Sequence, residues 1–193
     1  SAASGPVAEG GVGGGAGMTS YGFKGGIGTS SRLVSKDHGG YTVGVLVNAN
    51  HGTREQLTIA GVPVGQELRG YPAERARSAS SIVMVAATDA PLSARQLERL
   101  ALRMAMGLAR TGATANTSSG DLMLAFSTAK FGTVPLADER LTPLYQAVVD
   151  ATEESVLNSL ALGTDVVGAD GTPCPGLPLD RVVAMLKSRG AIR

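Results

Sequence analysis

Apolar runs predict several strands, most of them in the middle of the chain. Residues 82–87 are consecutive apolar residues without alternation, a pattern that predicts a strand buried on both faces. Residues 41–48 are rich in β-branched side chains and mostly apolar, so they predict a second strand of the same kind. Residues 121–128 predict a third apolar strand, and residues 57–64 predict a shorter strand with a turn.

Helical spacing of apolar residues predicts three helices between and after these strands. Ser93 and Gln96 form a capping-box pattern, and a stripe of apolar residues follows them at helical spacing. A long helix is expected from Thr142, with Pro143 at its first helical position, and a last amphipathic helix is expected from Leu179. Strands that are buried on both faces need cover on both faces. The order of elements therefore predicts a layered α/β architecture in which sheets are sandwiched by helices.

Glycine is concentrated at the start of the chain. It makes up 27 of 193 residues, about twice its usual share, and much of the excess precedes residue 70. Residues 11–16 loosely match a dinucleotide-binding fingerprint, but no convincing strand precedes them and no helix follows. The better interpretation is that these glycines let the backbone pack closely against another segment. Residues 66–80, which are polar and lack an apolar period, predict an exposed linker.

Composition argues against several classes of function. The net charge is only +1 and the charges are well mixed, so a nucleic-acid partner is not expected. The single cysteine, Cys174, excludes an internal disulfide, and no histidine pair has metal-binding spacing, so neither a metal nor another cofactor is expected. His38 and His51 each stand in a turn and are interpreted as surface or capping residues. No apolar run is long enough to span a membrane and no signal-peptide pattern is visible, so a cytoplasmic protein is predicted.

Candidate chemistry centres on Ser81, which stands where the polar segment 66–80 meets the apolar run 82–87. If the chain is cut before Ser81, that residue carries both a hydroxyl and an α-amine. An α-amine with a pKa of about 7.7–8.0 can serve as the general base for the hydroxyl, so no histidine is required. The same hydroxyl could make the cut by attacking the preceding carbonyl, which forms an ester that water opens. The plain alternative is a structural serine at the start of a strand.

Several motifs around Ser81 resemble one enzyme family. They are residues 7–18, 22–32, 43–50, 81–83, 87–92, 118–121 and 125–129, and together they extend over nearly all of the chain. In these motifs the sequence is similar to the L-aminopeptidase/D-esterases and β-aminopeptidases, which are self-processing N-terminal-nucleophile hydrolases of the peptidase S58 type.

The resemblance implies a fold and a chain organisation. The fold is a four-layer αββα sandwich, shared with ornithine acetyltransferases, and part of its N-terminal half is expected to be lacking here. Residues 1–193 would form a single catalytic domain. Cleavage between Ser80 and Ser81 would leave residues 1–80 as the C-terminal part of an α chain and residues 81–193 as a β chain, and homo-oligomers of this heterodimer are implied.

The resemblance also implies a role for each of a few polar residues. Ser81 matches the nucleophile, and Asn50 matches the asparagine whose amide donates a hydrogen bond to the oxyanion. Ser119 matches the serine that hydrogen-bonds near the nucleophile and its amine. Asp121 matches the acidic residue that orients or supports that amine. Ser80 stands where the family often has glycine, which makes Ser80 a rival nucleophile.

The leading hypothesis is therefore a serine aminopeptidase or amidase that removes N-terminal residues from short peptides, amides or esters through an acyl-enzyme, without a cofactor. A pantetheine-type amide hydrolase or an ornithine acyltransferase-like enzyme is an alternative, although these relatives tend to use threonine as the nucleophile. An uncleaved, non-catalytic scaffold is the alternative from another class of function.

Overall fold

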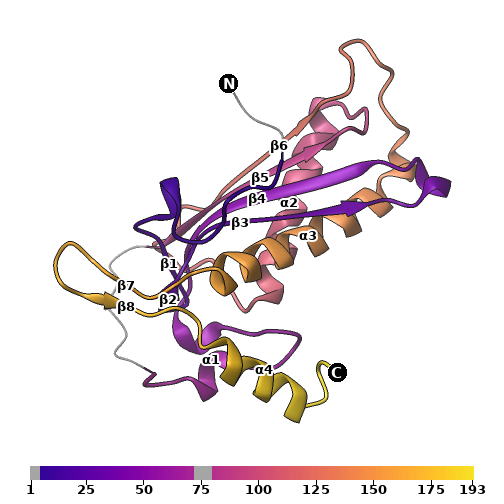
Figure 1. Cartoon of the computed structure of the whole chain (residues 1–193). Helices are drawn as coiled ribbons and strands as arrows, with labels where there is room; N and C mark the ends of the chain where they lie inside the picture. Colours follow the sequence, from indigo (N-terminus) through magenta and orange to yellow (C-terminus); the bar gives the residue numbers. More distant parts are fainter. Residues whose placement is uncertain (1–4, 72–79) are drawn as a thin grey trace.

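A mixed four-stranded sheet forms the centre of the fold. The computed structural model describes residues 5–71 and 80–193. The strands lie in the order β3 (Gly26–Leu33), β4 (Thr42–Asn50), β5 (Ser81–Thr88) and β6 (Leu122–Ser127), as Figure 1 shows. The pairs β3–β4 and β4–β5 are antiparallel, whereas β5 and β6 are parallel. The helix α2 (Ala94–Arg110) is the crossover between the two parallel strands.

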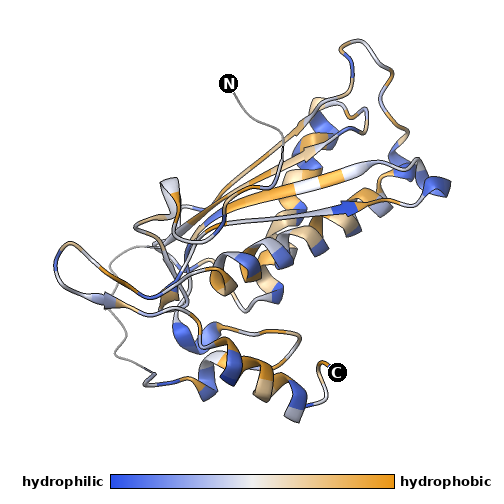
Figure 2. Cartoon of the chain, viewed as in Figure 1, coloured by the Kyte–Doolittle hydropathy of each residue, from blue (hydrophilic) through white to orange (hydrophobic). Residues whose placement is uncertain are grey.

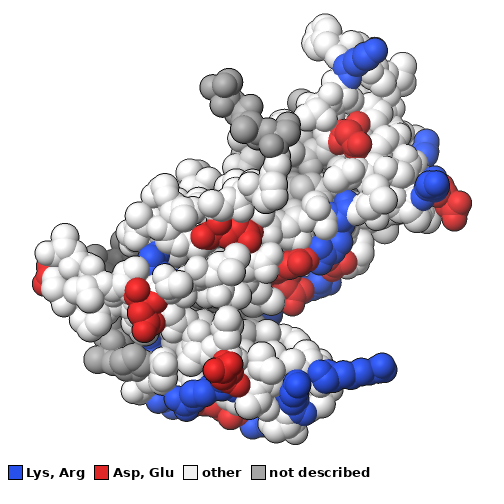
Figure 3. Space-filling view, in the orientation of Figure 1, with Lys and Arg blue, Asp and Glu red and all other residues white. Residues whose placement is uncertain are grey.

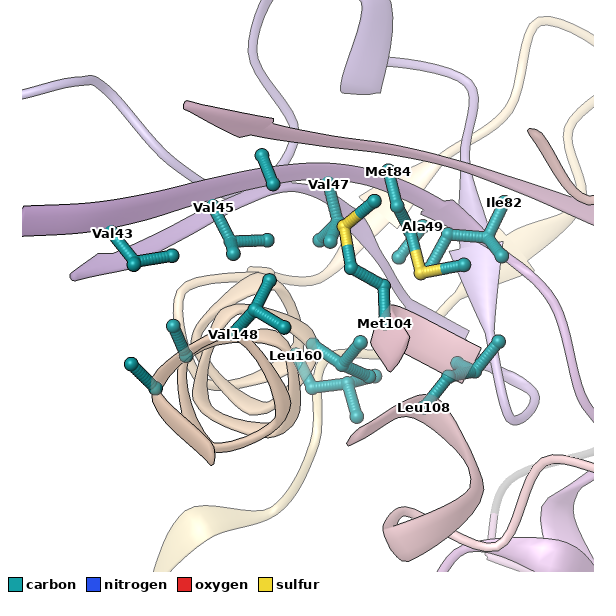
Figure 4. Packing of buried hydrophobic residues seen from close by; sticks show 14 of the residues in the cluster. Val43, Val45, Val47, Ala49, Ile82, Met84, Met104, Leu108, Val148 and Leu160 are labelled. Atoms are coloured by element: carbon teal, nitrogen blue, oxygen red, sulfur yellow. The ribbon is translucent and has the colours of Figure 1, made fainter. Parts of the chain in front are cut away.

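Two long helices cover one face of this sheet. The helix α2 and the helix α3 (Thr142–Ala161) lie beside each other, with α3 over β3 and β4 and α2 over β6 (Figure 1). The predicted capping box of α2 is confirmed, because the Ser93 hydroxyl accepts from the Gln96 amide and the Gln96 side chain accepts from the Ser93 amide. In Figure 4 the labelled side chains of β4 and β5 point toward the two helices. The labelled core residues are Val43, Val45, Val47, Ala49, Ile82, Met84, Met104, Leu108, Val148 and Leu160.

The smaller elements lie at the ends of the sheet. The four-residue helix α1 (Val64–Glu67) lies near the last helix α4 (Leu179–Ser188), and an ion pair joins Glu67 to Arg189 (Figure 1). The remaining strands are β1 (Thr19–Ser20), β2 (Phe23–Lys24), β7 (Val166–Val167) and β8 (Pro173–Cys174), and short 3-10 helices span Gly13–Gly15, Lys36–His38, Arg54–Gln56 and Asp138–Arg140. None of the helices in the described part of the chain is long and apolar enough to cross a membrane.

The predicted strands at 41–48, 82–87 and 121–128 and all three predicted helices are confirmed. The strand expected at 57–64 is wrong: Ile59 and Val62 form only an isolated bridge. Between them Ala60 and Gly61 both take positive φ, so the chain reverses before a strand can extend. Most of the linker expected at 66–80 lies outside the described residues.

The second face of the sheet is largely uncovered by the described residues, so the expected burial on both faces is wrong for them. Burial alternates along β4 and β5, and only one set of side chains lies under the helices. On the other face Val83, Leu124 and Phe126 are 41–61% exposed. Figure 2 shows that apolar residues make up much of β4, β5 and β6. The described residues thus form one sheet and one helical layer, which is half of the expected αββα arrangement.

Charged side chains of both signs are interspersed on the face that Figure 3 shows. Some of them join elements that pack together. Arg32 on β3 pairs with Glu154 on α3 at 2.5 Å, and Arg110 on α2 pairs with Asp150 on α3 at 2.6 Å. The Ser30 hydroxyl, and secondarily Arg32, holds the pKa of Glu154 below its usual value.

The strand β3 was not predicted, because its glycines and serines lack the β-branched pattern of a buried strand. The glycines there serve close packing, as the composition suggests. A Cβ atom on Gly28 would lie 1.9 Å from the carbonyl oxygen of Ser155 and 2.9 Å from the Cβ of Ser159. The backbone of β3 therefore lies directly against α3, and only glycine fits at this position.

Gly28→Ala is expected to lower the free energy of unfolding by about 1–3 kcal/mol or more, because the added methyl group must push β3 and α3 apart. Gly44→Ala is the matched control, since a Cβ atom at Gly44 on the neighbouring strand meets nothing within 4 Å. Its effect is expected to stay within about 0.5 kcal/mol. Urea unfolding of both variants measures the difference, and equal effects would contradict this account of the packing.

Candidate active site

Strand register brings the predicted site residues to one end of the sheet. Asn50 is the last residue of β4 and is the cross-strand partner of Ser81, the first residue of β5. Direct partners in an antiparallel pair have side chains on the same face, with Cβ atoms about 5 Å apart. Because β6 runs parallel to β5, its starting end lies at the same edge, and Asp121 immediately precedes it. Residues far apart in the sequence thus meet here.

Asn50 and Ser81 lie on the face of the sheet opposite α2 and α3. The buried residue next to Asn50 is Ala49, and the one next to Ser81 is Ile82, and both point toward the helices. Side chains alternate along a strand, so Asn50 and Ser81 point to the other side. A nucleophile on this side is not covered by the helical layer.

The hydroxyl of Ser81 lies directly beside the peptide bond that precedes it. Its Oγ donates to the carbonyl oxygen of Ser80 at 2.7 Å and accepts from the amide of Gly120 at 3.1 Å. Ser80 is 9% exposed, so this carbonyl is held in a nearly buried place. The Gly120 amide was not among the predicted site groups, although it lies between the predicted Ser119 and Asp121.

Ser119 and Asp121 are hydrogen-bonded to each other, and Asp121 also binds the backbone at the start of β5. The Oδ1 atom of Asp121 accepts from the Ser119 hydroxyl at 2.6 Å and from the backbone amide of Ile82 at 3.1 Å. Hydrogen bonds to a carboxylate are among the stronger ones in proteins. The carboxylate is therefore anchored to the backbone one residue beyond Ser81.

Asn50 is oriented by a backbone amide from the glycine-rich part of the chain. Its Oδ1 atom accepts from the amide of Thr19 on β1 at 3.1 Å. The two polar atoms of an amide group point in different directions, so this contact turns Nδ2 away from Thr19. The side chain can then present its donor on the face that it shares with Ser81.

A small pocket borders this cluster, and Ser80, Ser119 and Asp121 line it. His51 also lines it, and so does the loop 113–116, which the sequence did not single out. The interpretation of His51 as a surface or capping residue is wrong. Its side chain is 3% exposed, its Nδ1 lies 3.1 Å from the Ser20 hydroxyl, and its ring meets that of Tyr21 edge to face.

His38, by contrast, is exposed, as expected, at the end of the 3-10 helix Lys36–His38. Among residues 5–71 and 80–193 no group of three His, Cys, Asp or Glu side chains is arranged to hold a metal ion.

Comparison with known proteins places this arrangement in a family. The model of peptidase family S58 matches residues 1–174. The chain belongs to peptidase family S58. The S58 chain is 44% identical, over 210 aligned residues, to the β-peptidyl aminopeptidase BapA of Sphingosinicella xenopeptidilytica. That alignment covers 96% of the chain and 52% of BapA.

Solved structures agree with this assignment. A β-aminopeptidase from Burkholderia sp. superposes with a TM-score of 0.89 at 44% identity, covering 97% of the S58 chain and 56% of that protein. The L-aminopeptidase D-Ala-esterase/amidase of Ochrobactrum anthropi superposes with a TM-score of 0.87 at 42% identity, covering 99% and 55%. That protein is described as a prototype of the serine aminopeptidases and a variant of the Ntn hydrolase fold. The S58 chain has this fold and spans about half the length of these relatives.

Proposed function

We propose that this S58 protein is a serine aminopeptidase or amidase that cuts its own chain between Ser80 and Ser81 and then uses Ser81 as an N-terminal nucleophile. The observation that carries the proposal is the position of the Ser81 hydroxyl, 2.7 Å from the carbonyl oxygen of the peptide bond to be cut. Asn50, Ser119 and Asp121 surround the same strand end.

Self-cleavage would proceed by transfer of an acyl group from nitrogen to oxygen. Rotation of the Ser81 side chain brings Oγ onto the carbonyl carbon of Ser80, where a C–O bond forms and the C–N bond breaks. The hydroxyl proton goes to the departing nitrogen, which becomes the α-amine of Ser81. Water then hydrolyses the ester, so residue 80 ends in a carboxylate and Ser81 regains its hydroxyl. Residues 1–80 and 81–193 become the ends of two separate chains.

The freed α-amine would then serve as the general base for substrate hydrolysis. It takes the proton of the Ser81 hydroxyl while Oγ attacks the carbonyl of the substrate, and it returns the proton to the leaving amine. Water hydrolyses the acyl-enzyme in the second half of the reaction. Asp121 favours the charged form of this amine through proximity, and Ser119 keeps the Asp121 carboxylate in place.

Asn50 would stabilise the negative charge that develops on the substrate carbonyl oxygen. A donor that is held in place before the reaction stabilises the transition state more than the ground state. The names of the relatives indicate the class of substrate: one acts as a β-peptidyl aminopeptidase, and another as an L-aminopeptidase and D-Ala-esterase/amidase. We therefore propose short peptides, amides or esters with a free N-terminal residue as substrates.

Mass spectrometry of the purified protein tests the proposal. We expect a fragment that begins at Ser81, together with turnover of amino-acid p-nitroanilides that include β-amino acids. An intact chain without turnover would contradict the proposal and favour an uncleaved scaffold. A fragment that begins at Ser80 would move the nucleophile to that residue.

A further inference from the structure

Lys24 on β2 is a buried cation whose position the proposed reaction does not explain. The residue is 1% exposed, and its ammonium donates to the carbonyl oxygens of Gly15 at 2.8 Å, Met18 at 2.8 Å and Gly25 at 2.7 Å. An ammonium has three N–H donors, so these contacts use all of them. Burial, opposed by the nearby Cys174, lowers the pKa of Lys24. Burying a cation against neutral carbonyls is costly, which calls for a reason beyond stability.

The three carbonyls belong to the segment 15–25, and Lys24 connects distant parts of this segment through its ammonium. Gly15 stands at its beginning and Gly25 at its end, and the Gly25 amide also donates to the Met18 carbonyl at 3.1 Å. The ammonium therefore ties both ends of the segment to its middle. That middle is followed directly by Thr19 and Ser20, which form β1.

One peptide group connects this clamp to the candidate active site. The Met18–Thr19 peptide carries both the carbonyl that accepts from Lys24 and the amide that donates to Oδ1 of Asn50. A peptide group is planar, and in a trans peptide its C=O and N–H point in opposite directions. Fixing the carbonyl with an ammonium on one side therefore fixes the direction of the N–H on the other. A carbonyl that accepts from a cation also polarises its peptide group, which strengthens the N–H as a donor.

The neighbouring contacts keep the same segment in register with the end of β4. The Tyr21 amide donates to the His51 carbonyl at 2.8 Å, and the Ser20 hydroxyl lies 3.1 Å from Nδ1 of His51. These bonds position the segment along the strand, whereas the contact of Lys24 sets the plane of the Met18–Thr19 peptide, whose amide donates to Asn50.

We propose that Lys24 is a positioning residue for Asn50: it holds the Met18–Thr19 peptide so that the Thr19 amide binds Oδ1 and the Nδ2 donor of Asn50 is aimed at the oxyanion. This inference rests on the proposed function, in which Asn50 is the oxyanion donor. It assigns Lys24 no contact with the substrate or with Ser81. Its effect is expected on the chemical step and not on substrate binding.

A double-mutant cycle with Lys24→Met and Asn50→Ala tests the inference in the full protein. Methionine keeps the length of the side chain and removes the ammonium. Lys24→Met is expected to lower kcat about 10- to 100-fold with little change in KM, because a slightly misplaced donor loses much of its effect. In the Asn50→Ala background the same change is expected to lower kcat less than about threefold, since the group that Lys24 orients is already absent. Rates are referred to the amount of freed Ser81, measured by mass spectrometry.

Arg54→Met is the matched control. Arg54 is also a 1% exposed cation, it donates to the carbonyl of Gly22 in the same segment, and it stacks on Phe23. It does not contact the Met18–Thr19 peptide through these bonds. Its loss is therefore expected to lower the melting temperature and to change kcat by the same factor in the wild-type and the Asn50→Ala backgrounds. The inference would be overturned if Lys24→Met lowered kcat by the same factor in the Asn50→Ala background as in the wild type.

A second variant and a second readout cover the cases in which Lys24→Met does not fold or processes poorly. If Lys24→Met does not fold, Lys24→Gln, which retains a neutral donor, is carried through the same cycle with the same expected coupling. If a variant processes too slowly for the cleaved form to be isolated, the rate of self-cleavage replaces kcat as the readout. A wild-type protein that neither cleaves nor turns over substrate would contradict the proposed function itself. An active wild type with independent losses would contradict only the role of Lys24.

Discussion

Ser81→Ala is expected to abolish both self-cleavage and peptide turnover. In the proposed mechanism the same Oγ atom attacks the Ser80 carbonyl during processing and the substrate carbonyl during catalysis, so loss of the hydroxyl removes both reactions. Loss of the nucleophile lowers kcat by about 10⁶-fold in other hydrolases, and an effect of that order is expected here. Gel electrophoresis and mass spectrometry detect the uncut chain, and release of p-nitroaniline measures the turnover.

Ser118→Ala is the matched control, because Ser118 is an exposed serine in the same loop as Ser119. It is expected to process and to turn over substrate at nearly the wild-type rate. Cleavage that persisted in Ser81→Ala and disappeared in Ser80→Ala would instead assign the nucleophile to Ser80. The register of β5 favours Ser81, since its side chain faces the same side as Asn50.

Asn50→Ala is expected to lower kcat by about 10²- to 10³-fold and to leave KM nearly unchanged. A single oxyanion donor contributes this much in other hydrolases, because it binds the charge that exists only in the transition state. Self-cleavage is expected to slow as well, since in the proposed mechanism the Ser80 carbonyl would pass through the same kind of intermediate. Steady-state kinetics per freed Ser81, together with the time course of processing, measure both effects.

Asn158→Ala is the control for this substitution. Asn158 lies on α3 and donates through Nδ2 to the carbonyl of Thr29 at 2.9 Å, so it makes a structural hydrogen bond outside the cluster around Ser81. Its loss is expected to affect stability and not kcat. A rise in KM without a fall in kcat for Asn50→Ala would show that Asn50 binds the substrate and does not stabilise the transition state.

Most regular elements could be predicted from the sequence because their signals are local. The capping box at Ser93 and Gln96 marks the start of α2, and the apolar run after Ser81 marks β5. The strand β3 lacks such a signal, because Gly28 is selected by its contact with α3 and not by strand preference. The segment 57–64 has strand-like residues, but the turn at Ala60 and Gly61 reverses it.

The groups of the candidate site also fall into those that the sequence could predict and those that it could not. Ser81, Asn50, Ser119 and Asp121 could be proposed from motifs, since each belongs to a short sequence pattern that resembles one family. The amides of Gly120 and Thr19 could not be proposed, because a backbone N–H has no residue-specific signature. His51 was misjudged for a related reason: a turn in the sequence does not reveal that β1 packs over it.

The linear pattern of residues was enough to predict the order of the main strands and helices, the polar-to-apolar junction at Ser81 and the family to which the motifs point. These features depend on neighbouring residues and on motif spacing, which are present in the linear chain. The tertiary structure alone decided that Asn50 pairs with Ser81, that Asp121 anchors the start of β5 and that Lys24 reaches Asn50 through one peptide group. Strand register and hydrogen bonds between distant segments produce these contacts, and both arise only when the sheet has formed.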